Sequence, residues 1–157
     1  ILRRQSTTEP VTIHLHTCGG MYEEGMAIYD AIKSMPYHVT IISYTHARSM
    51  SSIILQAGDI RLMMPHSYFM FHLGTLEFAG DNRMVLSNAD FAKLDNKTMV
   101  DIYVEKARKG PKFKGWSKTK IRALINREME KKNDVFLLPQ QAIDWGFADG
   151  ILTEWPN

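Results

Sequence analysis

The pattern of apolar and polar residues changes several times along the first half of the chain. In residues 11–17 apolar and polar side chains alternate, which is typical of a strand with one buried face. After Gly19-Gly20 the apolar residues recur at helical spacing as far as about Met35, so a helix that ends at Pro36 is predicted. Residues 39–44 are β-branched and apolar and form the second predicted strand.

The same order then repeats. Residues 50–58 have the pattern of a short buried helix that ends at Gly58, and residues 60–64 and 68–72 have the pattern of two more strands. Strands that alternate with helices require right-handed crossovers between parallel strands. The sequence therefore predicts an α/β fold with a largely parallel sheet and flanking helices.

The second half of the chain is mainly helical. A long helix is predicted over residues 82–107, followed by a basic loop at residues 109–115. Ser117 is a suitable N-cap for a further helix that runs to about Lys132. Residues 135–138 form a short apolar run, and Pro139 and Gly146 bracket one more short helix.

The composition of the chain excludes some classes of protein. The 157 residues suit one domain with an ordinary core, and no apolar run reaches the roughly 18–20 residues of a membrane span. The single cysteine, Cys18, excludes an intrachain disulfide and fits a reducing cytosol. The net charge is +2, and eight basic residues and no acidic one lie between Lys106 and Arg122. We interpret this segment as a solvated surface, with nucleic-acid binding as the alternative.

Candidate chemistry gathers where the predicted strands end. Ser49 lies where a strand gives way to a helix, which exposes its hydroxyl beside the N–H of Met50. Gly19-Gly20 forms a second such turn at the same sheet edge. His72 ends another strand and has a side chain suited to act as a base for a serine. Asp134 precedes the short apolar run.

Each of these residues also has a simpler interpretation from the residues alone. The glycines could only start a helix, the histidine could be packed, and the aspartate could be a cap. Cys18 could be a nucleophile beside a helix N-terminus, but we favour a small buried residue. His14 and His16 have a spacing that a metal could use, but we favour exposed strand histidines and expect no metal site.

Several segments together resemble the ClpP family of self-compartmentalised serine peptidases. Residues 16–20 match the family's N-S-P-G-G segment, and residues 25–30 match the helix motif G-x-x-I-Y-D. Residues 45–50 match the nucleophile motif G-x-A-[AS]-S-M, and residues 55–58 match a helix end with Ala-Gly. Residues 69–74 match the base motif of apolar residues and I-H-Q-P, and residues 134–149 match D-x-F-[LM]-[ST]-x-x-E-A-x-x-[WY]-G-[LI]-[VI]-D. The likeness extends over residues 11–153. It implies a ClpP/crotonase-like fold with a protruding helical handle.

The resemblance also assigns roles. It implies that Ser49 is the nucleophile, His72 the base and Asp134 the residue that orients the base. It places the oxyanion hole at the N–H groups of Gly20 and Met50. The strand at residues 73–76 and the residues after Gly20 would pair with an extended peptide. The substrate-binding residues expected on this basis are Gly19, Met21, Leu73, Gly74 and Thr75.

The resemblance implies a single domain over residues 1–157, with the handle at about residues 76–132. It also implies heptameric rings that stack through the handle as a tetradecamer. A AAA+ Clp unfoldase would thread unfolded polypeptides into the chamber and use ATP, so no cofactor is expected in this chain. The N-terminal axial segment of the family is expected to precede Ile1. The expected location is cytoplasmic, in a bacterium or a phage-infected host, with the plastid stroma as the other candidate.

The chain departs from the family pattern at Cys18, Thr45, Arg48, residues 73–74 and Leu138. We interpret it as a diverged member, with phage and plastid genomes as candidate sources. Arg48 stands beside the nucleophile, where a long cation could narrow the substrate cleft. The basic stretch resembles an insertion in the handle. Two rival functions stay open: a catalytically weak or inactive ring subunit, and an acyl-CoA enzyme of the related crotonase fold.

Overall fold

The computed structural model describes residues 9–75 and 77–154. The elements in chain order are β1 (Val11–Thr17), α1 (Tyr22–Lys33), β2 (Val39–Arg48), α2 (Met50–Leu55), β3 (Ile60–Met63), β4 (Tyr68–Phe71), α3 (Asn82–Ala107), a 3₁₀ turn (Pro111–Phe113), α4 (Lys118–Lys132), β5 (Val135–Leu137), α5 (Pro139–Asp144) and β6 (Gly150–Ile151). The axial segment expected before the chain, residues 1–8 and Leu76 lie outside the described residues.

Strand β2 is the centre of the sheet. Parallel strand β1 pairs along one edge of it, from Val11 opposite Val39 to Thr17 opposite Ala47. The other edge is shared by β3 at its first half and β4 at its last three residues, both parallel to β2. Strand β6 extends the sheet beyond β3, and β5 pairs with β4 in the antiparallel direction. The predicted α/β class with a largely parallel sheet is confirmed.

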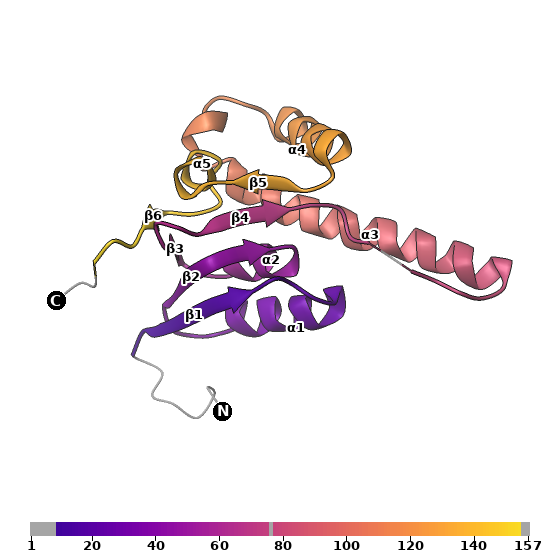
Figure 1. The fold of residues 1–157 in the computed structure, drawn as a ribbon, viewed down its shortest axis with the longest axis horizontal. Helices are drawn as coiled ribbons and strands as arrows, with labels where there is room; N and C mark the ends of the chain where they lie inside the picture. The colour runs from indigo at the N-terminus through magenta and orange to yellow at the C-terminus, as the bar shows by residue number, and fades with distance from the viewer. Residues whose placement is uncertain (1–8, 76, 155–157) are drawn as a thin grey trace.

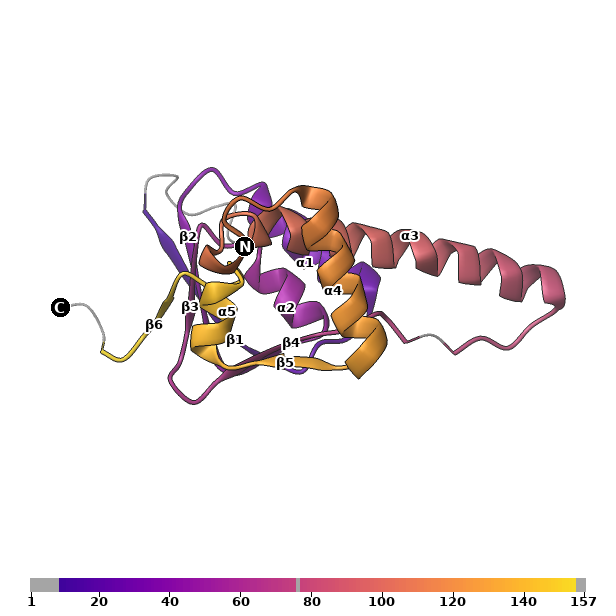
Figure 2. The ribbon, with the colours of Figure 1, turned by 90° about the horizontal axis from the view of Figure 1, so that it is seen from above.

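Helices α1 and α2 pack against one face of this sheet (Figures 1 and 2). The core between them is built from fully buried side chains, among them Ile41, Ile53 and Leu55. Phe69 and Phe71 of β4 lie in the same core, and the ring of Phe147 stacks on Phe69 at 4.9 Å between centroids. Burial of such large apolar side chains stabilises the sheet end at which the candidate residues lie.

Helix α3 has two different halves. Its C-terminal half is buried in the core through Met99, Val100, Tyr103, Val104 and Ala107. Its N-terminal half, capped by the side chain of Asp81, extends past the sheet (Figure 1) and carries the exposed apolar residues Met84, Val85, Leu86, Phe91 and Leu94. A protruding helix with an exposed apolar surface is typical of an interaction site.

Three features of the fold differ from the prediction. Strand β2 continues four residues beyond the predicted strand, because residues 46–48 pair with β4. The two-residue strand β6 was not predicted. The basic loop contains a 3₁₀ turn whose Phe113 is buried against the rings of Trp116 and Trp145, so this part of the segment is anchored to the core.

A buried charge holds the end of the sheet to the C-terminal turn. Arg61 of β3 is almost fully buried, and its guanidinium donates to both carboxylate oxygens of Asp149. It also donates to Gln56 and to the carbonyl of Gly146. Burial raises the pKa of Asp149, but the hydrogen bonds and charge of Arg61 outweigh it, so the net pKa is lowered. This pair explains the aspartate at the end of the last motif.

Within residues 9–75 and 77–154, no helix is both long and apolar enough to cross a bilayer.

Candidate active site

Ser49 occupies a strained turn between β2 and α2. Its backbone has φ 52° and ψ −126°, a conformation that residues with a Cβ rarely adopt and that typically costs about 1–3 kcal/mol. The Ser49 N–H donates to the carbonyl of Met70 in β4 at 2.9 Å, which helps to hold the turn. The turn has the strand-to-helix geometry of a nucleophile elbow.

The Gly19 turn packs directly against the Ser49 turn. A Cβ at Gly19 would lie 2.7 Å from the Cβ of Ser49 and 2.9 Å from the carbonyl oxygen of Arg48, and its φ is 108°. The hydroxyl of buried Ser51 joins the two turns, since it lies 2.7 Å from the carbonyl of Thr17 and accepts from the N–H of Arg48 at 2.7 Å. These contacts require glycine at position 19.

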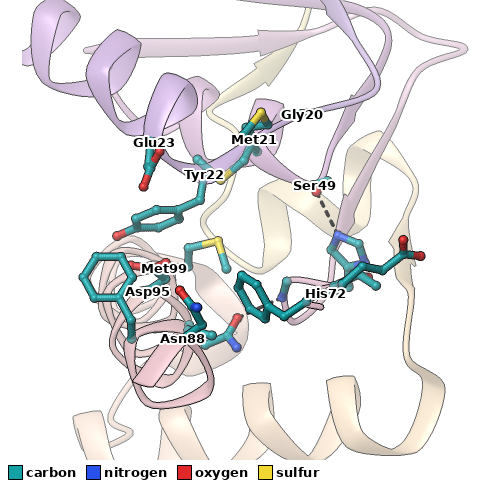
Figure 3. A pocket seen from close by; sticks show the side chains of 17 residues that line it. Gly20, Met21, Tyr22, Glu23, Ser49, His72, Asn88, Asp95 and Met99 are labelled. Atoms are coloured by element: carbon teal, nitrogen blue, oxygen red, sulfur yellow. Dashed lines mark hydrogen bonds between the residues drawn. The ribbon is translucent and has the colours of Figure 1, made fainter. Parts of the chain in front are cut away.

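His72, directly after β4, reaches both other candidate residues. Its Nε2 lies 2.8 Å from Ser49 Oγ, and its Nδ1 lies 3.1 Å from Asp134 Oδ1 (Figure 3 shows the first bond). A carboxylate only accepts, so Nδ1 carries hydrogen and a neutral ring offers Nε2 to the serine hydroxyl. This arrangement can take the proton of Ser49 as its oxygen attacks a carbonyl.

The pairing of β4 with β5 positions Asp134 next to His72. The strands are antiparallel with Phe71 opposite Val135, so the residues just beyond this pair, His72 and Asp134, face each other. Asn133 turns the chain from α4 into β5 with φ 59°, and its side-chain amide donates to Asp134 Oδ1 at 3.3 Å. The carboxylate is therefore held by local backbone geometry as well as by the histidine.

Two backbone N–H groups lie at the rim beside Ser49. Gly20 and Met50 both line the same cavity as the serine and the histidine. In the described part of the chain, neither N–H donates a hydrogen bond to a protein group. Two unpaired amides beside a nucleophile can bind the oxygen of a substrate carbonyl.

The cavity has a volume of about 580 Å³ and lies between the strand ends and α3 (Figure 3). Of the expected substrate-binding residues, Met21, Gly74 and Thr75 line it, whereas Gly19 and Leu73 do not. Residues 73–75 are irregular and form no strand. The Gly74 N–H donates to Asn96 Oδ1 at 2.8 Å, which ties this segment to α3.

The far wall of the cavity was not predicted. It comes from one face of α3, and its residues include Asn88, Ala92, Asp95, Asn96 and Met99. Positions 88, 92, 95 and 99 have the spacing of one helical face, which is the signal that could have identified them. The sequence offers no sign that this face turns toward Ser49.

The cavity also contains acidic side chains. Glu23 of α1 and Asp95 of α3 both line the cavity (Figure 3). Burial, and then the negative charge of Glu23, raises the pKa of Asp95.

Other candidates lie elsewhere. Cys18 is exposed, so its interpretation as a small buried residue was wrong, and it does not line the cavity. Arg48 pairs with Met70 across the sheet and is not among the described residues that line the cavity. His14 and His16 are exposed as expected. Among the described residues no group of three or more His, Cys, Asp or Glu could hold a metal ion.

A Ser-His-Asp arrangement at the edge of a parallel sheet defines the type of site, and comparison with known proteins gives the family. A model of the Clp protease family matches residues 1–155. An ATP-dependent Clp protease proteolytic subunit from Deinococcus radiodurans is 29% identical over 156 residues, 98% of this chain and 70% of that protein. One from Mesostigma viride is 29% identical over 154 residues, 97% of this chain and 62% of that protein, so the chain spans less than two thirds of this relative. The chain belongs to the Clp protease family.

Proposed function

We propose that this chain is the catalytic subunit of a ClpP-type serine endopeptidase that cleaves unfolded polypeptides. The observation that carries the proposal is the unbroken line of hydrogen-bond distances from Ser49 Oγ through the His72 ring to Asp134. A hydroxyl, an imidazole and a carboxylate at such distances form the recognised signature of an activated serine. The family and the names of the two relatives support the same reaction class.

In the proposed reaction, Ser49 Oγ attacks the scissile carbonyl while His72 Nε2 takes its proton. Asp134 accepts from Nδ1–H and stabilises the imidazolium that forms. The histidine then gives the proton to the leaving amine, and water hydrolyses the acyl-enzyme by the same route. No step needs a metal or cofactor from this chain.

The N–H groups of Gly20 and Met50 would bind the oxyanion of the tetrahedral intermediate. Each such donor is worth roughly 3–4 kcal/mol in other serine peptidases. The positive φ of Gly20, 152°, presents its backbone without a side chain, and a Cβ there would meet no atom within 4 Å. A substrate backbone therefore has room to approach.

The substrate would bind as an extended strand beside residues 73–75 and the residues after Gly20. Because the Gly74 N–H is already engaged by Asn96, the peptide would pair with the backbone groups of Leu73 and Thr75, after residues 73–75 take up an extended conformation beside it. Pairing through the backbone tolerates many substrate sequences.

For the assembly we propose two stacked heptameric rings that meet through α3, with a AAA+ Clp unfoldase that supplies ATP-driven threading. The exposed apolar side chains on the protruding half of α3 support this role, because a solvated helix seldom carries so many. We place the assembly in a bacterial or host cytosol or in the plastid stroma.

Labelling with a fluorophosphonate tests the active site. We expect the reagent to modify Ser49, and His72→Ala to slow the modification by about 10³-fold because the serine then lacks its base. Mass spectrometry of peptides locates the adduct, and Ser67→Ala, a buried serine remote from the site, is the matched control.

An unreactive Ser49 in the assembled protein would favour the inactive ring subunit. Turnover of a CoA thioester, without cleavage of a fluorogenic peptide, would favour the crotonase-like alternative.

Substitution of the α3 surface tests the assembly. We expect sedimentation to give a particle of fourteen chains for the unmodified protein. Leu86→Lys combined with Leu94→Lys should dissociate the two rings from each other. Burial of the two leucines in the contact between rings would contribute about 4 kcal/mol per chain, and lysines buried there without a partner would destabilise the contact. Ser87→Lys, an exposed polar position on the same helix, is the control. A monomer in the unmodified protein at micromolar concentration would contradict the chamber.

A further inference from the structure

The carbonyl of Ser49 is held by a chain of buried hydroxyl groups that reaches α3. Ser52 donates to this carbonyl twice, from its backbone N–H at 2.9 Å and from its Oγ at 2.6 Å. The same Ser52 Oγ lies 2.6 Å from the hydroxyl of Tyr103. Ser52 is fully buried and Tyr103 is 1% exposed, so water does not compete for these bonds.

The direction of these hydrogen bonds follows from their chemistry. A carbonyl only accepts, so the single hydrogen of the Ser52 hydroxyl points to Ser49. Tyr103 must then donate to Ser52. Burial raises the pKa of Tyr103, partly offset by the bond to Ser52, so its hydroxyl stays protonated wherever a histidine base works.

The tyrosine ring has little freedom to move. It packs against Phe71 and Phe147, with centroids 5.5 Å and 5.4 Å away, and against Phe69 at 6.3 Å. Its hydroxyl is therefore a fixed point supplied by α3, the helix that also forms the far wall of the cavity.

The peptide group held in this way is the one that matters for the proposed reaction. The carbonyl of Ser49 and the N–H of Met50 belong to one planar peptide unit, so fixing the oxygen fixes the direction of the N–H. The Met50 N–H is the proposed oxyanion donor. Ser49 has a strained backbone, so loss of the Ser52 hydroxyl, which leaves the bond from the Ser52 N–H, weakens the restraint on the peptide plane.

We propose that Tyr103 and Ser52 are positioning residues that aim the Met50 N–H at the oxyanion. This inference rests on the proposed function. Neither side chain touches the substrate: both act on the transition state through the orientation of one peptide plane. Their loss should therefore lower kcat and leave KM unchanged.

The test is a kinetic comparison of Tyr103→Phe, Ser52→Ala and the double variant with a fluorogenic peptide. We expect kcat to fall about 5-fold for Tyr103→Phe and about 20-fold for Ser52→Ala, with KM within twofold, since a misdirected donor loses part of an oxyanion-hole interaction. Because Tyr103 acts through Ser52, the double variant should match Ser52→Ala. A peptide aldehyde inhibitor should lose affinity by the same factors as kcat/KM.

Matched controls separate positioning from packing. Ser67→Ala removes a buried hydroxyl that donates to the carbonyl three residues earlier, as Ser52 does, and Tyr44→Phe removes a tyrosine hydroxyl bonded to His14. Both should keep kcat. Thermal unfolding and sedimentation show whether each variant keeps its fold and assembly, and Ser52→Ala carries the test if Tyr103→Phe does not.

The outcomes are distinct. Unchanged kcat in both single variants, a change in KM alone, or additive losses in the double variant would overturn the positioning role while the unmodified protein still cleaves peptide. Absence of cleavage and of Ser49 labelling in the unmodified protein would overturn the proposed function, and the positioning role with it.

Discussion

Ser49→Ala should reduce peptide hydrolysis by about 10⁴-fold or more, because it removes the hydroxyl that lies 2.8 Å from the His72 Nε2. Residual activity would come from binding and the oxyanion donors acting on water. The measurement is the initial rate with a fluorogenic peptide, with Ser67→Ala as the control that keeps full activity. A rate within tenfold of the unmodified protein would exclude Ser49 as the nucleophile and make exposed Cys18 the next candidate.

The same position allows a second readout that concerns stability. Since Ser49 has φ 52° and ψ −126°, Ser49→Gly should relieve backbone strain and be more stable than Ser49→Ala by about 1 kcal/mol. Thermal midpoints at equal protein concentration compare the two inactive variants. Equal midpoints would show that the turn is not strained in solution. A gain in stability on loss of activity would mean that the strain is maintained for function.

Much of the fold follows from local patterns. The long helix over residues 82–107 and the helix that begins after Ser117 have the bounds that the sequence predicts, because apolar spacing and a capping serine act locally. The predicted strand was shorter than β2, because residues 45–48 are not an apolar β-branched run. These residues belong to the strand through their pairing with β1 and β4. Tertiary pairing decides such positions.

Local sequence patterns predict some parts of the candidate site and not others. Ser49 and the Gly19-Gly20 turn could be placed by strand-to-helix junctions, which are visible in the sequence. The role of Asp134 came only from a resemblance, because its approach to His72 depends on the antiparallel register of β4 and β5. The α3 wall of the cavity and the bond from Tyr103 to Ser52 depend on how α3 crosses the core. No local pattern encodes that crossing.

Gly19→Ala is expected to be the most damaging substitution that leaves every proposed catalytic group in place. The new Cβ would lie 2.7 Å from the Cβ of Ser49, 2.9 Å from the carbonyl oxygen of Arg48 and 3.1 Å from the N–H nitrogen of Met50. Backbone atoms cannot yield as a flexible side chain can, and φ 108° is itself unfavourable for alanine. We expect the free energy of unfolding to fall by about 3–5 kcal/mol.

Activity should fall as well, because the two turns must separate. The Ser49 turn is also held by the carbonyl of Met70, so a shift of a few tenths of an ångström would move the hydroxyl and the Met50 N–H relative to His72. A misplacement of about 1 Å can cost about 10²-fold in kcat, so for this smaller shift we expect kcat to fall by about 10-fold. Gly115→Ala is the matched control: its φ of 80° is also positive, but an added Cβ meets no atom within 4 Å. It should lose about 1 kcal/mol of stability and no activity. If Gly19→Ala kept the kcat of the Gly115→Ala control, the close packing of the two turns could not be what aligns the proposed nucleophile.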